Sequence, residues 1–243
     1  MIELESVSRS YGRKKAVDGL TLSIPPGRLF AFLGPNGAGK TTTIRMLVGL
    51  LRPDSGTIHV CGLDMTKETR DAAGLIGYVA DDSFLYDKLS GRELLEFVGE
   101  IRGMTRQEVA RRIEREIGRF ELGAFIDLLI ETYSHGMKQR VALASALMHD
   151  PKVLVVDEPL LGLDPRSVRF VKDLLREHTR RGATVFLSTH TLSVVEEIAD
   201  SLGIIHQGRL LFVGSIRDLR ARLTAEDQAL ESMFLQLTEE NGA

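Results

Sequence analysis

The pattern of hydrophobic and polar positions divides the first fifty residues into short elements. Apolar and polar residues alternate from Ile2 to Val7, as in an edge strand with one buried face. Residues 16–24 have similar character and predict a second strand pair, which ends at Pro25-Pro26-Gly27. A continuous apolar run, Leu29–Leu33, then predicts a buried strand, and the helical spacing of residues 42–50 predicts a helix behind it.

Strand-like and helical stretches alternate through the rest of the chain. Further strands are predicted at residues 57–60, 75–79, 153–156, 184–187, 202–205 and 209–213, and a helix at 165–181. Between residues 89 and 149 the sequence pattern predicts helices: Ser90 opens one helix, and Thr105 with Glu108 forms a capping box for the next. The alternation implies an α/β fold with a largely parallel sheet and a helical insert.

Composition narrows the class of protein. The chain has 243 residues, 43% of them hydrophobic, which suits one large α/β domain. A net charge of −3 argues against a general nucleic-acid binder, so no nucleic-acid partner is expected. The single cysteine, Cys61, excludes an intrachain disulfide. No apolar run approaches the ~18–20 residues that span a bilayer, and the N-terminus lacks signal-peptide character, so we expect a cytosolic chain unless a partner holds it at a membrane.

The residues between the buried strand and its helix form a phosphate-binding loop. They fit the pattern G-x-x-x-x-G-K-[ST] and are Gly34, Pro35, Asn36, Gly37, Ala38, Gly39, Lys40, Thr41 and Thr42. Glycines let backbone N–H groups turn towards phosphate oxygens, and the helix N-terminus adds partial positive charge. Lys40 would reach the β- and γ-phosphates, and the Thr41 hydroxyl would ligate Mg²⁺. The alternative is a plain glycine-rich turn, which the flanking strand and helix disfavour.

Two acidic residues and a histidine are candidates for the chemistry. Asp157 and Glu158 follow the apolar run 153–156, which reads as a central parallel strand that delivers carboxylates to its C-terminal edge. Asp157 can hold Mg²⁺ and Glu158 can act on the attacking water. His190 follows the next predicted strand, so parallel pairing brings it to the same edge, where it can donate to the γ-phosphate. By themselves, the acids could be simple caps and the histidine structural.

These motifs together resemble the ATP-binding subunit of an ABC transporter. The segment Tyr133-Ser134-His135-Gly136-Met137-Lys138-Gln139-Arg140 is similar to the family signature, in the YSxGMxQR form of bacterial exporter ATPases. The resemblance implies a P-loop NTPase fold with an antiparallel β subdomain beside the mostly parallel core. It divides the single domain into a core with the β subdomain (1–80 and 151–214), a helical subdomain with the signature (81–150) and a helical tail (215–243).

The resemblance also implies ligands, partners and further site residues. Tyr11 matches the aromatic residue that stacks on adenine. Ser134 and Gly136 match the groups that bind the γ-phosphate of ATP held by the opposite protomer, and Asp164 matches the loop that contacts that protomer. The implied ligands are ATP and Mg²⁺. The implied partners are integral-membrane permease subunits on the cytoplasmic face of a membrane and a second ATPase protomer, identical or different.

Three departures from the family pattern bear on the chemistry. Asp81 stands where the family usually has glutamine; it can hold Mg²⁺ through oxygen, but it adds negative charge next to the triphosphate. Leucines at 160 and 161 replace a small polar residue and a serine, and His135 replaces glycine or lysine. None of these three departures removes Lys40 or the strand-end acids. Separately, residues 230–238 resemble the closing helix of exporter-type ATPases.

Three hypotheses therefore stand. The leading one is a Mg²⁺-dependent ATPase that powers an exporter with separate permease subunits. The second is a soluble ABC ATPase in assembly or repair, although the chain has neither the long coiled coil of repair members nor the duplicated domains of translational ones. The third is a regulatory nucleotide-binding subunit with low turnover, suggested by Asp81 and the leucines.

Overall fold

A computed structural model describes residues 2–81 and 85–221 of the chain. Within these ranges the strands are β1 (Ile2–Tyr11), β2 (Lys14–Ile24), β3 (Leu29–Leu33), β4 (Ser55–Val60), β5 (Leu63–Asp64), β6 (Ile76–Val79), β7 (Val153–Asp157), β8 (Thr184–Thr189), β9 (Ser201–His206) and β10 (Arg209–Gly214). The helices are α1 (Lys40–Leu47), α2 (Thr69–Gly74), α3 (Gly91–Ile101), α4 (Arg106–Phe120), the 3₁₀ turn η1 (Ile130–Thr132), α5 (His135–Leu147), α6 (Pro165–Arg180), α7 (Leu192–Ile198) and α8 (Ile216–Ala221).

The main sheet has the strand order β10-β9-β3-β8-β7-β6 and is parallel except for β10, which confirms the predicted α/β class. Every residue of β3, β7 and β8 is buried, as expected for central strands of a sheet that is covered on both faces. The register pairs Leu33 with Thr189 and Asp157 with Ser188. The carboxyl ends of these three strands therefore lie together at one edge of the sheet.

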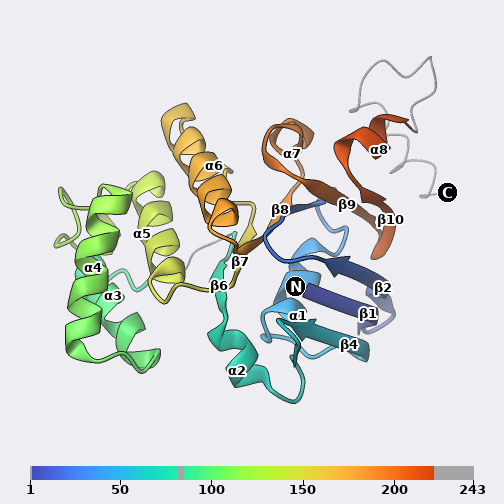
Figure 1. Cartoon of the computed structure of the whole chain (residues 1–243), viewed down its shortest axis with the longest axis horizontal. Helices are drawn as coiled ribbons and strands as arrows, with labels where there is room; N and C mark the ends of the chain where they lie inside the picture. Colours follow the sequence, from blue (N-terminus) through green and yellow to red (C-terminus); the bar gives the residue numbers. More distant parts are fainter. Residues whose placement is uncertain (1, 82–84, 222–243) are drawn as a thin grey trace.

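A smaller antiparallel sheet has the order β2-β1-β4-β5 (Figure 1). Two sequence-based expectations are wrong here. β1 is an inner strand rather than an edge strand, because β4 pairs with its other side. Residues 16–24 belong to one long strand, β2, rather than to a strand pair. The α1 residues Ile44 and Leu47 share a hydrophobic cluster with side chains of both sheets, so α1 fixes the sheets against each other.

Helices α3, α4 and α5 form the insert, which lies to one side of the sheets (Figure 1). The predicted capping box of Thr105 with Glu108 begins α4, and Ser90, predicted to open a helix, begins α3 in a capping box with Glu93. The division of the domain into core, helical subdomain and tail stays a prediction. The tail begins with α8, and the predicted closing helix at 230–238 lies outside the described residues.

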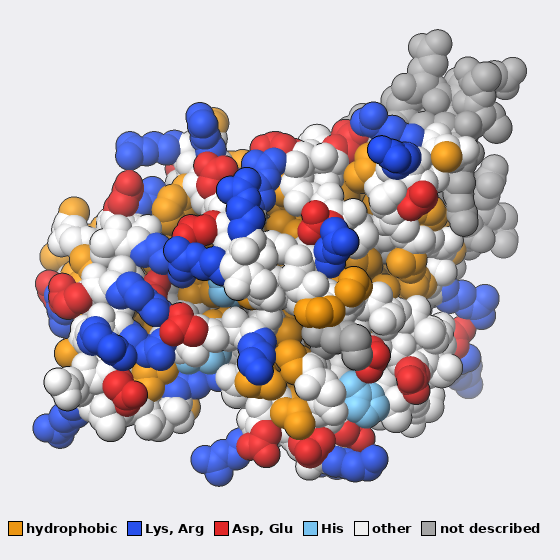
Figure 2. Space-filling model, viewed as in Figure 1, with side chains coloured by type: hydrophobic (Ala, Val, Ile, Leu, Met, Phe, Trp, Pro, Cys, Tyr) orange, Lys and Arg blue, Asp and Glu red, His pale blue; other side chains and the backbone are white. Residues whose placement is uncertain are grey.

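Charged side chains of both signs cover the face of the molecule seen in Figure 2, and Lys and Arg are especially frequent over the helical insert and α6. Across the described ranges, no helix combines the length and apolar character needed to cross a bilayer.

Candidate active site

The phosphate-binding loop joins β3 to α1, as predicted, and two of its glycines are required by close backbone contacts. A Cβ atom on Gly39 would lie 2.4 Å from the carbonyl oxygen of Ala16, and the residue has a φ of 112°. A Cβ on Gly34 would lie 2.4 Å from the carbonyl oxygen of Ile205. These distances are shorter than a van der Waals contact, so side chains cannot replace either glycine without moving the neighbouring strands.

Lys40 is the first residue of α1, so the helix begins earlier than residue 42, where the sequence placed it. Its side chain is only 6% exposed and folds back along the loop. The ammonium donates to the carbonyl oxygens of Gly34 (2.7 Å) and Pro35 (3.4 Å) and lies 3.3 Å from Oε1 of Glu158. The lysine charge is thus held at the mouth of the loop, beside the strand-end acids.

Asp157 is the last residue of β7 and is buried. Its Oδ1 accepts a short hydrogen bond from the hydroxyl of Ser188, the residue beside it on β8. Its other oxygen, Oδ2, is buried and has no hydrogen-bond partner among the described residues. A buried carboxylate oxygen without a partner is costly unless a donor or a cation meets it. This oxygen therefore fits a metal ligand.

Glu158 adopts a left-handed backbone conformation, with a φ of 47°, which is strained for a residue with a Cβ. Its N–H donates to the carbonyl and hydroxyl oxygens of Ser188 (3.1 and 3.3 Å), which holds the strained turn in place. Nδ1 of His190 lies 3.0 Å from Oε1 of Glu158. The parallel sheet thus brings His190 to the acidic edge, as predicted, and its partner there is the Glu158 carboxylate.

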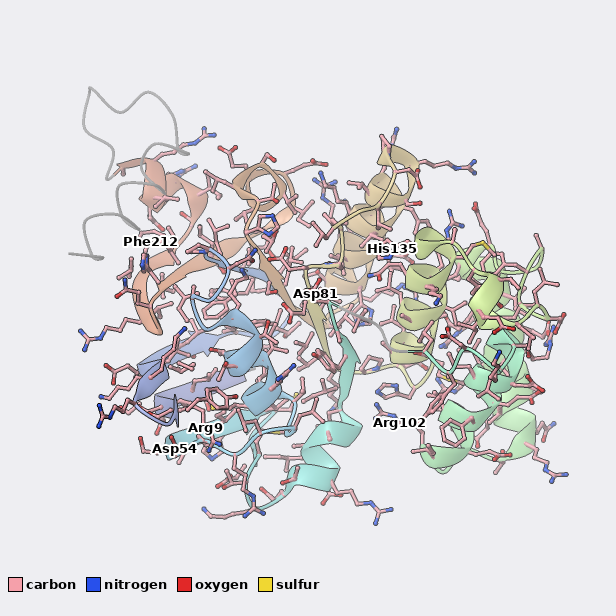
Figure 3. All side chains as sticks on the ribbon, turned by 180° about the vertical axis from the view of Figure 1, so that it is seen from behind. Arg9, Asp54, Asp81, Arg102, His135 and Phe212 are labelled. Carbon is pink, nitrogen blue, oxygen red and sulfur yellow. The ribbon has the colours of Figure 1, made fainter. Side chains whose placement is uncertain are left out.

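A cavity of about 260 Å³ lies over this edge, lined by the phosphate-binding loop, Asp157 and Glu158. Tyr11, which is 49% exposed, and Asp81 line it too. Figure 3 places Asp81 in the middle of the molecule, where β6 ends, between the core and the insert. The cavity therefore unites the predicted phosphate, adenine and acidic residues.

The end of β1 that carries Tyr11 is held by contacts the sequence did not reveal. The Asp54 carboxylate accepts from the Arg9 guanidinium (2.6 Å) and from the backbone N–H of Ser10 (2.7 Å). Arg9 also lies 5.5 Å from the centre of the Tyr11 ring, a cation–π distance. Figure 3 shows Arg9 and Asp54 together on the small sheet.

The signature segment forms the start of α5, and its residues do not line the cavity. Ser134 is the N-cap and accepts from the N–H of Met137 (3.3 Å). The Gln139 side chain donates to the carbonyl oxygen of Pro159 (3.2 Å), and Nε2 of His135 lies 3.0 Å from that of Leu161. Two side chains thus tie the signature helix to the loop between β7 and α6.

Asp164 ends that loop and caps α6. Its carboxylate accepts from the N–H groups of Arg166 (2.9 Å) and Ser167 (3.1 Å) and from the Ser167 hydroxyl (2.6 Å). These hydrogen bonds, chiefly those from Ser167, lower the pKa of Asp164. Gly136 packs nearby, since a Cβ on it would lie 3.4 Å from the Ser167 hydroxyl oxygen. The predicted inter-protomer residues therefore cluster with one another rather than with the phosphate-binding loop.

The family model described as ABC transporter matches residues 17–161. The chain belongs to the ABC transporter family. It is an ATP-binding and ATP-hydrolysing subunit that powers a membrane transporter, and its sheets, insert and phosphate-binding loop have the arrangement of that family's ATPase domain.

Three relatives of this ABC ATPase are informative. The linearmycin resistance ATP-binding protein LnrL of Bacillus subtilis is 39% identical over 92% of this chain and 72% of its own length. The Nod factor export ATP-binding protein I of Paraburkholderia xenovorans is 39% identical over 88% of this chain and 70% of its own. A solved ATP-binding subunit of an ABC transporter is 29% identical, covers 98% of this chain and 99% of its own, and superposes with a TM-score of 0.89.

Proposed function

We propose that this ATPase drives export through separate integral-membrane permease subunits and lies at the cytoplasmic face of the membrane. The observation that carries the proposal is the Lys40–Glu158–His190 cluster, in which Lys40 and Glu158 line a cavity of about 260 Å³ and His190 contacts Glu158. Similarity to a resistance protein and an export protein, each at 39% identity, supports export as the direction.

In the proposed reaction the loop N–H groups and Lys40 bind the β- and γ-phosphates of ATP and stabilise the charge that is transferred. Glu158, which lines the cavity, accepts a proton from the attacking water or orients it. His190 fixes the position of the same carboxylate and can also donate to the γ-phosphate. Tyr11 offers its ring to adenine.

Magnesium fits the residues present. Asp157 supplies a buried, unpartnered Oδ2, and the Thr41 hydroxyl stands at the start of α1 on the cavity wall. Asp81 is a third candidate oxygen ligand on that wall. The described residues contain no group of three or more His, Cys, Asp or Glu that would hold a metal without help, so phosphate oxygens would complete the shell. When bound, Mg²⁺ neutralises charge on the β- and γ-phosphates.

A second ATPase protomer is part of the proposal. Ser134 and Gly136 lie at a helix N-terminus, which attracts anions, yet neither lines the cavity of its own chain. A head-to-tail dimer would let each protomer present these groups, and the loop that ends at Asp164, to ATP on the other. Either an identical or a different ATPase subunit could serve.

Affinity purification from detergent-solubilised native membranes tests the proposal. We expect a polytopic membrane protein to co-purify, and ATP turnover by the complex to be lost in Glu158→Gln. Recovery of soluble partners alone, with the chain absent from the membrane fraction, would contradict the permease and favour a soluble assembly ATPase. Turnover that is equally low with and without membranes would favour a regulatory subunit.

A further inference from the structure

A second cavity, of about 420 Å³, lies at the opposite edge of the main sheet from the phosphate-binding loop. Pro26, Lys152 and Thr184, which line it, stand at or just before the amino ends of β3, β7 and β8. Arg119 of α4 and Asp150, just beyond α5, line it from the insert. The cavity is therefore separate from the ATP site and spans the junction between insert and core.

Two side chains on its wall carry buried hydrogen-bonding atoms that have no partner among the described residues. Nε and Nη2 of Arg119 are buried and have no hydrogen-bond partner among the described residues, and the nearest carboxylate oxygens, on Glu116 and Glu177, are 3.9 Å from the guanidinium. His178 of α6 is only 7% exposed, and its Nε2 is also without a hydrogen-bond partner there. Buried polar atoms of this kind are rare unless a ligand or water meets them.

The charge balance around the cavity favours an anion. Five cationic side chains, Arg112, Arg115, Arg119, Lys152 and Arg181, lie in or next to it, against three carboxylates, Asp150, Glu116 and Glu177. The carboxylates are already engaged: Asp150 pairs with Arg112 and Arg115 (2.5 and 2.9 Å), Glu116 with Arg115 (2.6 Å) and Glu177 with Arg181. Arg119 keeps only the two 3.9 Å contacts with Glu116 and Glu177, and Lys152 has no ion pair among the described residues.

The protonation state of His178 agrees with this balance. Burial, together with the positive charges of Arg119 and Arg181, lowers the pKa of His178 to about 4. The imidazole is therefore neutral near pH 7 and has one N–H to donate.

We propose that this cavity is a second binding site, distinct from the ATP site, for a small phosphate-bearing anion held by Arg119, His178, Lys152 and Arg181. Guanidinium groups offer paired N–H donors that match phosphate oxygens, and all four of these side chains line the one cavity. Because the wall combines Arg119 of the insert with His178 of the core, the bound anion also links these two parts of the chain.

The sole cysteine, Cys61, lines the same cavity, so its rate of alkylation can report whether the cavity is occupied. The experiment uses the full chain with Lys40→Ala, so that phosphate bound in the ATP site does not contribute. The rate of Cys61 alkylation by iodoacetamide, a neutral reagent, is measured against inorganic phosphate and against chloride at equal ionic strength. We expect phosphate to slow alkylation in a saturable way and chloride not to.

Variants locate the effect. Lys152→Ala with Arg181→Ala changes only exposed side chains, so folding should be kept, and half-protection should need on the order of tenfold more phosphate. Arg119→Gln should abolish protection. Arg169→Ala, on the exposed face of α6, is the matched control and should behave like the parent. Equal protection by chloride, or unchanged protection in the Lys152/Arg181 variant, would overturn the site.

A second arm distinguishes sources of the anion. Glycerol 3-phosphate stands for an organic monoester and inorganic phosphate for the free ion. Whichever of the two half-protects Cys61 at the lower concentration identifies the class of the ligand. Protection by neither overturns the proposal.

Discussion

Lys40 Nζ lies 3.3 Å from Glu158 Oε1, and both side chains are almost fully buried. The cation that is to hold the phosphates and the carboxylate that is to act on water are therefore an ion pair. Phosphate oxygens that enter the loop compete with Glu158 for the same ammonium. Nucleotide binding and release of the Glu158 carboxylate are thus coupled through one side chain.

Replacing Glu158 by glutamine tests this coupling. Glu158→Gln removes a negative charge next to Lys40, so ATP should bind at least as tightly as in the parent. Loss of a general base should lower turnover by about 10²–10⁴-fold. Equilibrium binding of a fluorescent ATP analogue and phosphate release measure the two effects. Turnover close to the parent value would rule out Glu158 as the base.

His190 contacts the same carboxylate oxygen of Glu158, Oε1, as Lys40 does. His190→Ala should lower kcat on the order of 10²-fold, as for the loss of one preorganised hydrogen bond. Asn places a nitrogen near the position of Nδ1, so His190→Asn should recover part of the loss. Steady-state kinetics with all three proteins check this. Equal kcat in the Ala and Asn variants would show that the contact with Glu158 is unimportant.

The dependence of ATPase activity on Mg²⁺ concentration tests whether Asp81 contacts the metal. If its carboxylate contacts Mg²⁺, directly or through a water, Asp81→Asn should raise the Mg²⁺ concentration for half-maximal turnover by roughly tenfold. Asp81→Gln installs the residue that the family usually has there and should retain a working site. ATPase activity is titrated with Mg²⁺ at fixed ATP. An unchanged midpoint in Asp81→Asn means that Asp81 is not a metal contact.

Ser188 supports both strand-end acids, because it donates to Asp157 and accepts from the N–H of Glu158. Ser188→Ala should lower the free energy of unfolding by about 1–3 kcal/mol, since it leaves buried polar groups unpaired. Urea denaturation measures this. Ser145→Ala is a control, because the Ser145 hydroxyl donates to the carbonyl oxygen of Ala142 within its own helix. Equal losses in the two variants would contradict a special role for Ser188.

Stability should fall in mild acid. Burial is the main cause that lowers the pKa values of His149 and His178 to about 4. Above pH ~6.5 these rings are neutral in both the folded and the unfolded chain. Between pH ~6.5 and ~4 only the unfolded chain takes up protons, so the free energy of unfolding falls by about 1.4 kcal/mol per pH unit for each ring. Unfolding free energies at pH 7.5 and 5.5 should differ accordingly, and less so in His178→Gln.

The sequence predicted the parts of the site that depend on local order. Leu29–Leu33, the glycine loop and Lys40 are consecutive, so their strand-loop-helix form follows from the pattern alone. His190 was placed correctly because parallel strands end at a common edge. The contact of His190 with Glu158 depends on side-chain directions at that edge, which spacing does not encode.

Other features depend on partners far away in the chain. β1 has an edge-like alternation but is an inner strand, because β4 joins it from residues 55–60. Ser188 is not predicted as a site residue from the sequence, although a hydroxyl group at the end of a buried strand is a signal for such a role. The capping role of Asp164, by contrast, has a local signal in the sequence, because an acidic residue directly before Pro165 is typical of a helix start.

The insert also protects the sheet. Among the described strands β6 pairs only with β7, yet side chains of the insert region, Arg102 and His149, bond the carbonyl oxygen of Ile76 on its outer side. A Cβ on Gly77 would lie 2.3 Å from the carbonyl oxygen of Ala146, so α5 lies directly against this strand. Exposed strand edges recruit other chains. A core deprived of residues 81–150 would therefore be prone to aggregation. The helical insert thus has a second role, since it shields the edge of the sheet from other chains.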